Sequence, residues 1–301
     1  MLRPLAAVPL LATLTLSACM SQNDPAAVSS LQDAVESACA PDGEKDICIA
    51  YRDLESGRTL LRDGDLVLHA ASTMKIAVMY AAFLAHDRKT LDLDAPVPVA
   101  NTFKSIVDGS PYTLTANDDS EKDLYEKLGT SLPSRELVRR MMVRSSNLAT
   151  NLMVDVVGAD TIQRTMESLD IHRMKVLRGV EDGPAFAAGL NNVATAHDLM
   201  LLLEAIWRGE GVSPASREAM MQILLAQEFN DLIPAGVPAG TPVAHKTGLI
   251  TGIRHDAGIV MPATGSPYVL VVLTRGFTDQ DEAARAVARV SRSVWTQLNG
   301  D

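Results

Sequence analysis

The sequence predicts an α/β (α+β) fold in which one antiparallel sheet, built from both ends of the chain and flanked by helices, lies beside an all-helical lobe. Three observations predict it. Strand-like segments occur near both ends, separated by Gly and Pro. Segments with helical periodicity fill the middle. A further helical segment closes the chain, so the first and last helices can cover a shared sheet.

The N-terminal part is predicted to be a helix followed by a hairpin. Residues 31–38 favour a short helix. The strand-like segments 47–52 and 58–61 flank Glu55-Ser56-Gly57, a turn signal. Residues 72–86 then carry apolar side chains at helical spacing.

The middle and the C-terminal part differ in their patterns. Residues 95–134 are rich in Pro, Asp and Ser, so we expect irregular structure there. One or two helices are predicted at 134–157, and further helices at 195–207 and 213–226; each segment begins with a hydroxyl cap candidate. Strands are predicted at 242–247, 256–261 and 268–274, before a closing helix at 279–298. We expect one domain over 31–301, with an α/β lobe (about 31–71 and 240–301) and a helical lobe (about 72–239).

The N-terminus predicts export. A charged start and a short apolar run precede small residues, which is typical of a signal peptide over residues 1–18. Leu16-Ser17-Ala18-Cys19 resembles a bacterial lipoprotein box, in which Cys19 is lipidated. The alternative is an ordinary signal peptide with a chance cysteine. We expect a periplasmic lipoprotein, anchored to the membrane through Cys19, with residues 19–30 as a polar tether.

Charge excludes one class of partner. Removal of the signal loses only Arg3, which leaves 26 basic against 37 acidic residues and a formal charge near −11. Nucleic acid is therefore not expected as a partner, because phosphate binding needs clustered Lys and Arg. A monomer is expected.

Cys39 and Cys48 are the other two cysteines. An even number in an oxidising compartment favours a disulfide between them. Two buried thiols are the alternative.

Three short motifs indicate the chemistry: Ser72-Thr73-Met74-Lys75, Ser145-Ser146-Asn147 and Lys246-Thr247-Gly248. Each is weak alone, but the three in this order form a specific signal. Together they resemble the signature of class A serine β-lactamases and penicillin-binding proteins, and the chain is similar to an atypical class A member over roughly 30–301. The resemblance implies a β-lactamase/transpeptidase-like fold and a β-lactam substrate. No cofactor is expected.

The first motif can form an activated nucleophile. Ser72 and Lys75 are three residues apart, so their side chains share one helix face. A serine hydroxyl needs a base to accept its proton. A lysine serves as base only when its pKa falls, which burial and a nearby cation such as Lys246 both promote. The alternative is a first-turn serine beside a solvated lysine.

The second motif supplies two further roles by resemblance. Ser145 would relay a proton to the leaving nitrogen, and Asn147 would hydrogen-bond the substrate amide. Ser146 stands where many class A members have Asp. In isolation this tripeptide would be a capping serine pair.

The third motif lies on a predicted strand. Lys246 supplies positive charge, Thr247 can bind a substrate carboxylate, and Gly248 allows the backbone to approach a ligand. The Leu249 N–H would complete an oxyanion hole with the N–H of the nucleophilic serine. Arg254 is a candidate carboxylate clamp; an exposed turn arginine is the alternative.

Glu181 is the candidate base for hydrolysis of the acyl-enzyme. The family uses a glutamate on a loop after the second motif, with an asparagine a few residues on. Here Arg178 is displaced by one residue and Ala185 stands at the asparagine position, so Asn191 or Asn192 could substitute. A solvated surface glutamate is the alternative.

Two other hydrolase classes find little support. The histidines show no metal-binding spacing, so no metal is expected, and no Gly-x-Ser-x-Gly elbow occurs. The sequence predicts a serine β-lactamase. The alternatives are a D,D-peptidase or another penicillin-binding-protein-like hydrolase, and a sensor or envelope protein that is acylated once and does not turn over.

Overall fold

The structure, a computed structural model, describes residues 25–300, with side chains from residue 29. The predicted signal peptide and Cys19 lie outside these residues. Helix α1 (Pro25–Cys39) begins six residues before the predicted start, so residues 25–30 of the predicted tether are helical. No helix in the described range has both the length and the apolar character that a membrane span requires.

One five-stranded sheet joins the two ends of the chain, in the order β2-β1-β11-β10-β9. All neighbours are antiparallel, as predicted. The N-terminal hairpin enters the sheet beside β11, where Ile47 pairs with Thr274. The strands are β1 (Asp46–Asp53), β2 (Thr59–Arg62), β9 (Val243–Ile250), β10 (Ile253–Val260) and β11 (Tyr268–Arg275).

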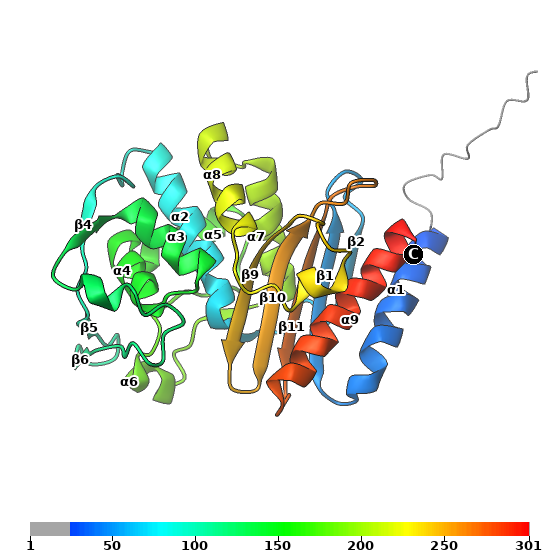
Figure 1. Ribbon diagram of the computed structural model, residues 1–301, viewed down its shortest axis with the longest axis horizontal. Helices are drawn as coiled ribbons and strands as arrows, with labels where there is room; N and C mark the ends of the chain where they lie inside the picture. The colour runs from blue at the N-terminus through cyan, green and yellow to red at the C-terminus, as the bar shows by residue number, and fades with distance from the viewer. Residues whose placement is uncertain (1–24, 301) are drawn as a thin grey trace, which may run out of the picture.

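Helices α1 and α9 (Gln280–Asn299) cover one face of the sheet and lie side by side (Figure 1). Ser293 Oγ donates to the Ala34 carbonyl at 2.8 Å across their contact. A short 3-10 turn, η1 (Ala40–Asp42), leads from α1 to β1. On the opposite face, α7 (Ala196–Arg208) packs against β1, β10 and β11, so the middle of the chain also covers the sheet.

The predicted disulfide is wrong: Cys39 and Cys48 are both free and buried. Side chains alternate across a strand, and Ile47 and Ile49 on β1 share the core under α1 with Cys39. Cys48 faces the other core, with Ala50. The sheet therefore separates the two thiols. Burial raises the pKa of Cys39 to about 11 and that of Cys48 to about 12.

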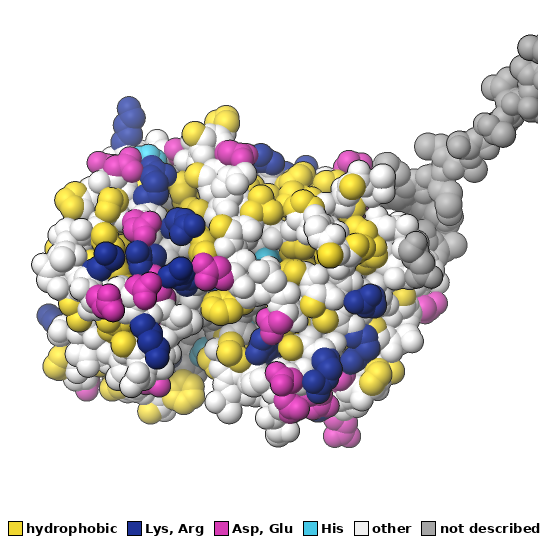
Figure 2. Space-filling model, in the orientation of Figure 1, with side chains coloured by type: hydrophobic (Ala, Val, Ile, Leu, Met, Phe, Trp, Pro, Cys, Tyr) yellow, Lys and Arg dark blue, Asp and Glu magenta, His cyan; other side chains and the backbone are white. Residues whose placement is uncertain are grey.

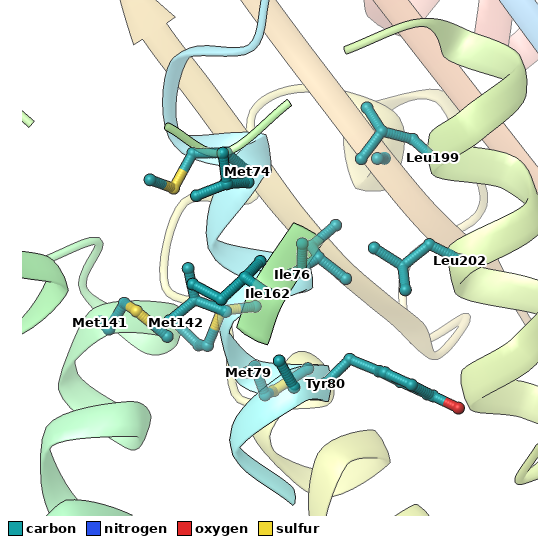
Figure 3. Close-up of a cluster of buried hydrophobic side chains, with 14 of the residues drawn as sticks. Met74, Ile76, Met79, Tyr80, Met141, Met142, Ile162, Leu199 and Leu202 are labelled. Carbon is teal, nitrogen blue, oxygen red and sulfur yellow. The ribbon is translucent and has the colours of Figure 1, made fainter. Parts of the chain in front are cut away.

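The helical lobe is built around α2 (Lys75–Asp87), which is buried on every side from Lys75 to Leu84. Figure 3 shows side chains from its neighbours pointing toward it, among them Met141, Ile162 and Leu199. The surrounding helices are α3 (Ser134–Val143), α4 (Asn147–Val157), α5 (Ala159–Ser168) and α8 (Pro214–Leu225). Close packing on all sides fixes Lys75, the first residue of α2.

Several local details differ from the prediction. The segment predicted as one helix from residue 72 begins with a 3-10 turn, η2 (Ala71–Met74). Residues 95–134 are largely irregular, as predicted. Their short elements are β4 (Pro96–Pro98), β5 (Phe103–Lys104), β6 (Pro111–Tyr112), η3 (Tyr125–Lys127) and β7 (Ser131–Pro133).

Helix α5, with ten residues, was not predicted. Four short elements were also missed, because segments of two to five residues carry too little periodicity. They are β3 (Leu68–His69), α6 (Gly183–Ala187), β8 (Val193–Ala194) and η4 (Ile233–Gly236). Two of these, β3 and β8, lie beside the loop that carries Glu181, and α6 lies within that loop, so the region predicted least well lies at the candidate site.

Candidate active site

Two hollows meet at Ser72 and Asn147, between the sheet edge and the helical lobe. The larger has a volume of about 560 Å³ and is bordered by His69, Glu181 and Leu249. The smaller, of about 220 Å³, is bordered by Ser145, Thr247, Gly248 and Arg254. Figure 2 shows a hollow between the lobes in its lower half, on the side where Figure 1 places α6 and the end of β9. The three motifs thus converge on one groove.

Ser72 lies on the η2 turn, which is held from both sides. The Ala71 N–H donates to His69 Nδ1 at 3.0 Å. A Cβ at position 248 would lie 3.1 Å from Ala71 Cβ and 3.3 Å from Ser72 N, so any other residue there would push β9 and the turn slightly apart. The close approach expected of Gly248 is therefore made to the serine turn itself.

The Ser145 hydroxyl lies between the Nζ atoms of two lysines. Lys75 Nζ donates to Ser145 Oγ at 3.1 Å, to the Ser145 carbonyl at 2.7 Å and to Asn147 Oδ1 at 3.1 Å. Lys246 Nζ donates to the same Oγ at 3.1 Å and to the Thr247 carbonyl at 2.8 Å. Since Oγ accepts twice, its own proton is available to another acceptor.

Burial controls the charge of both lysines. Burial lowers the pKa of Lys75 to about 7, and Asp119 and Glu181 oppose this shift. The pKa of Lys246 also falls well below its usual value, first through burial and then through the charge of Lys75, while Asp256 opposes the shift. A lysine with a pKa near 7 can accept a proton at neutral pH, as the sequence analysis required of Lys75.

Ser146 begins α4, and its Oγ accepts from the Ala149 N–H at 3.2 Å. Asp119 is buried beside it, and its Oδ2 accepts from the N–H groups of Asn147 and Leu148, both at 2.9 Å. A carboxylate stabilises these unpaired donors at the helix N-terminus. Sequence reasoning missed Asp119, because an aspartate in a polar loop carries no signal of burial.

Glu181 faces the larger hollow, where its Oε1 accepts from Asn147 Nδ2 at 2.8 Å. Desolvation by the walls of the groove is the main cause that raises its pKa, although the residue as a whole is exposed. The partner amide is therefore Asn147, and the expectation of Asn191 or Asn192 is wrong.

Asn191 and Asn192 instead form hydrogen bonds between the two ends of the loop. Asn191 Oδ1 accepts from Arg178 Nη2 at 3.0 Å. Asn192 Oδ1 accepts from the Leu177 N–H at 2.8 Å, and its Nδ2 donates to the Arg178 carbonyl at 2.9 Å. The two ends of the segment 178–192 are thus held together, as in a compact Ω-loop.

The smaller hollow carries the remaining predicted groups. Arg254 lies on β10 with 17% of its side chain exposed and forms an ion pair with Asp231, so it is not an exposed turn arginine. Thr247 is buried on β9. Because β9 is the sheet edge, alternate N–H groups along it have no partner in β10. The oxyanion role of the Leu249 N–H stays a prediction.

His69 borders the larger hollow, and His255 supports it from behind. The Thr274 N–H donates to His255 Nδ1 at 3.0 Å, so Nε2 carries the proton and donates to the His69 carbonyl at 3.0 Å. Burial lowers the pKa of His255 to about 4, which keeps it neutral. Within residues 25–300, no group of three or more His, Cys, Asp or Glu is arranged to hold a metal ion.

Three non-glycine residues in or beside the groove have left-handed backbone: Ala71 (φ 46°), Ser145 (φ 59°) and Glu181 (φ 63°). Such residues are rare, and each costs about 1–3 kcal/mol. They persist only where the surroundings hold them. Their concentration here supports a functional role for the groove.

The comparisons with known proteins point the same way. The model of the Beta-lactamase enzyme family matches residues 29–298. A β-lactamase of Bacillus licheniformis is 30% identical over 210 residues, which cover 65% of this chain and 66% of that protein, just under two thirds of its length. The solved structure of PBP-A has a TM-score of 0.75 at 26% identity, covering 89% of this chain and 95% of that one. A β-lactamase structure from Sphaerobacter thermophilus has a TM-score of 0.74 at 26% identity, covering 89% and 96%.

Proposed function

Because the chain belongs to the β-lactamase enzyme family, we propose that it hydrolyses the amide of a β-lactam through an acyl-enzyme on Ser72. The observation that carries this proposal is one groove with two sets of groups. Lys75, Ser145 and Lys246 form a linked cluster for acylation. Glu181 borders the same groove, where a water for hydrolysis would enter.

Acylation begins when Ser72 Oγ attacks the β-lactam carbonyl and its proton passes to a base. Lys75 is one candidate, since its pKa of about 7 leaves much of it neutral at physiological pH. Glu181 acting through a water is the other. The developing oxyanion is stabilised by the N–H groups of Ser72 and Leu249. As the C–N bond breaks, the Ser145 hydroxyl delivers a proton to the leaving nitrogen.

Deacylation requires an activated water. The Glu181 carboxylate accepts a proton from that water as its oxygen attacks the ester carbonyl. When the ester C–O bond then breaks, Glu181 gives this proton up and Ser72 Oγ regains one, so both groups return to their starting state. A raised pKa makes this carboxylate a stronger base than a solvated glutamate. Thr247 and Arg254 hold the substrate carboxylate in the smaller hollow during both steps.

A D,D-peptidase is the second candidate, because the similar structure of a PBP-A mutant is an acyl-enzyme complex with penicillin G, and a peptidase would form the same kind of ester on Ser72. A non-hydrolysing sensor would share the same acylation cluster. Both differ from a β-lactamase only in how long the acyl group stays on Ser72.

The location of the protein belongs to the same proposal. The N-terminal sequence supports export, lipidation of Cys19 and a periplasmic, membrane-anchored monomer. Replacing Cys19 by Ala should move the protein from the membrane fraction to the soluble periplasmic fraction. An unchanged distribution would contradict anchoring through Cys19.

One experiment tests the activity. Pure protein is mixed with a chromogenic cephalosporin, and turnover is followed together with intact mass. Sustained hydrolysis supports a β-lactamase. A stable mass increase without turnover supports the peptidase or the sensor, and Ser72→Ala is the control that should show neither signal.

A further inference from the structure

The backbone on both sides of Glu181 is held by side chains from other elements. On the N-terminal side, Asn151 of α4 accepts from the Val180 N–H at 2.6 Å and donates to the Val180 carbonyl at 3.0 Å. Gly179 packs directly on this side chain, since a Cβ there would lie 2.7 Å from Asn151 Cγ. The residue before Glu181 is thus fixed to the helical lobe.

On the C-terminal side, Asp182 connects the loop to a distant hairpin. Its Oδ1 accepts from Ser105 Oγ at 2.8 Å, and its Oδ2 accepts from the Ile106 N–H at 3.0 Å. Asp182 and Ser105 are only 1% and 4% exposed. The tip of the β5–β6 hairpin is itself closed by the Ser105 N–H, which donates to the Ser110 carbonyl at 2.8 Å. Hydrogen bonds to a buried carboxylate are strong, so this contact is rigid.

Glu181 needs this support. Its φ of 63° is unfavourable for a residue with a Cβ, and its side chain is exposed. A free loop would relax to ordinary backbone angles and turn the carboxylate away from Asn147.

We propose that Asp182 is a positioning residue for Glu181, and that the hairpin tip at Ser105 and Ile106 acts through it to hold the Glu181 carboxylate in the groove. The inference rests on the proposed function, in which Glu181 activates the water of deacylation. The hairpin is therefore part of the hydrolytic apparatus, although it contributes no side chain to that chemistry.

If Asp182 had only a structural role, its substitution would have a different effect. Asp182 also caps α6, where its Oδ1 accepts from the Ala185 N–H at 3.1 Å. A cap alone would affect stability and both reaction steps alike. Positioning of Glu181 affects the lifetime of the acyl-enzyme and leaves acylation unchanged.

The test measures acylation rate and adduct lifetime with benzylpenicillin by time-resolved intact mass. Asp182→Asn removes the charge, and Ser105→Ala removes one donor as a milder variant. Both should lengthen the adduct lifetime, Asp182→Asn by about 10- to 100-fold, because a shift of about 1 Å can change a rate that much. In a Glu181→Gln background, Asp182→Asn should add nothing further.

Asp87→Asn is the matched control. Asp87 accepts from the Ser213 N–H at 2.7 Å, from Ser213 Oγ at 2.9 Å and from Ser216 Oγ at 2.9 Å at the start of α8, outside the groove. Its adduct lifetime should equal that of the parent protein, while its melting temperature falls.

Two results would overturn the proposal. One is an unchanged adduct lifetime in both Asp182→Asn and Ser105→Ala. The other is an equal lengthening by Asp182→Asn with and without Glu181→Gln. A long-lived adduct on the parent protein would contradict the proposed hydrolysis instead, and the ratio of variant to parent lifetimes would still decide the role of Asp182.

Discussion

Lys75 and Lys246 lie on long regular elements and are fully buried, whereas Glu181 lies on an irregular loop and is exposed. The lysines are fixed by the packing of α2 and by the strand pairing of β9. The loop is fixed by individual hydrogen bonds: the amides of Asn151 and Asn192 donate to backbone carbonyls of the loop, and the Asp182 carboxylate accepts from a backbone N–H outside it. The groups proposed for acylation therefore share the stability of the core, while the group proposed for hydrolysis depends on a few contacts that single substitutions remove.

The nucleophile should give the largest effect. Ser72→Ala removes the hydroxyl proposed to form the ester, so we expect no covalent adduct and a loss of turnover of about 10⁶-fold. Intact mass after incubation with benzylpenicillin measures the adduct. Any labelling of this variant would place the nucleophile elsewhere.

A substitution at Glu181 should slow hydrolysis of the acyl-enzyme more than its formation, which distinguishes the role of the loop from that of the buried lysines. Glu181→Gln keeps the size of the side chain and removes the base, so acyl-enzyme should accumulate while hydrolysis slows by about 10²–10⁴-fold. Rapid-quench mass spectrometry gives both rates. Turnover equal to that of the parent protein would move the base to another residue.

The pH dependence of the acylation rate tests the buried Lys75. Below pH 7 Lys75 carries a proton and cannot accept another, so the acylation rate should rise with pH and level off above about 7. The slope approaches tenfold per pH unit on the acid side. Single-turnover acylation measured from pH 5 to 9 checks this, and a rate independent of pH would exclude Lys75 as the base.

A pair of glycine substitutions gives the smallest and most local test. Gly179→Ala places a methyl group against Asn151, which should weaken its hold on Val180, destabilise the protein by about 1–3 kcal/mol and slow deacylation. Gly183→Ala, in the same loop, meets nothing within 4 Å and should change neither property. Thermal melts and adduct lifetimes compare the two. Equal melting temperatures and adduct lifetimes in the two variants would show that the contact between Gly179 and Asn151 does not support the loop.

Strong periodic segments made the fold predictable. The apolar run of α2 and the strands at both chain ends each favour one structure locally, and all of them agree with one sheet. The motifs identified Ser72, Lys75, Ser145 and Lys246 because their chemistry depends on residue type. The two cysteines were misread, since spacing along the chain does not show which face of β1 a thiol occupies.

The sequence by itself determined the class of fold, and it indicated the candidate nucleophile and the two lysines of the groove, because periodicity and residue chemistry are written locally in the chain. Only the tertiary structure decided that Asn147 is the partner of Glu181, that Asp119 supports α4 and that Asp182 ties the loop to Ser105. Each of these contacts joins residues 28 to 77 positions apart. Hydrogen-bond partners that lie far apart in the sequence leave no periodicity and no motif in it. Only the packing of the folded chain brings them together.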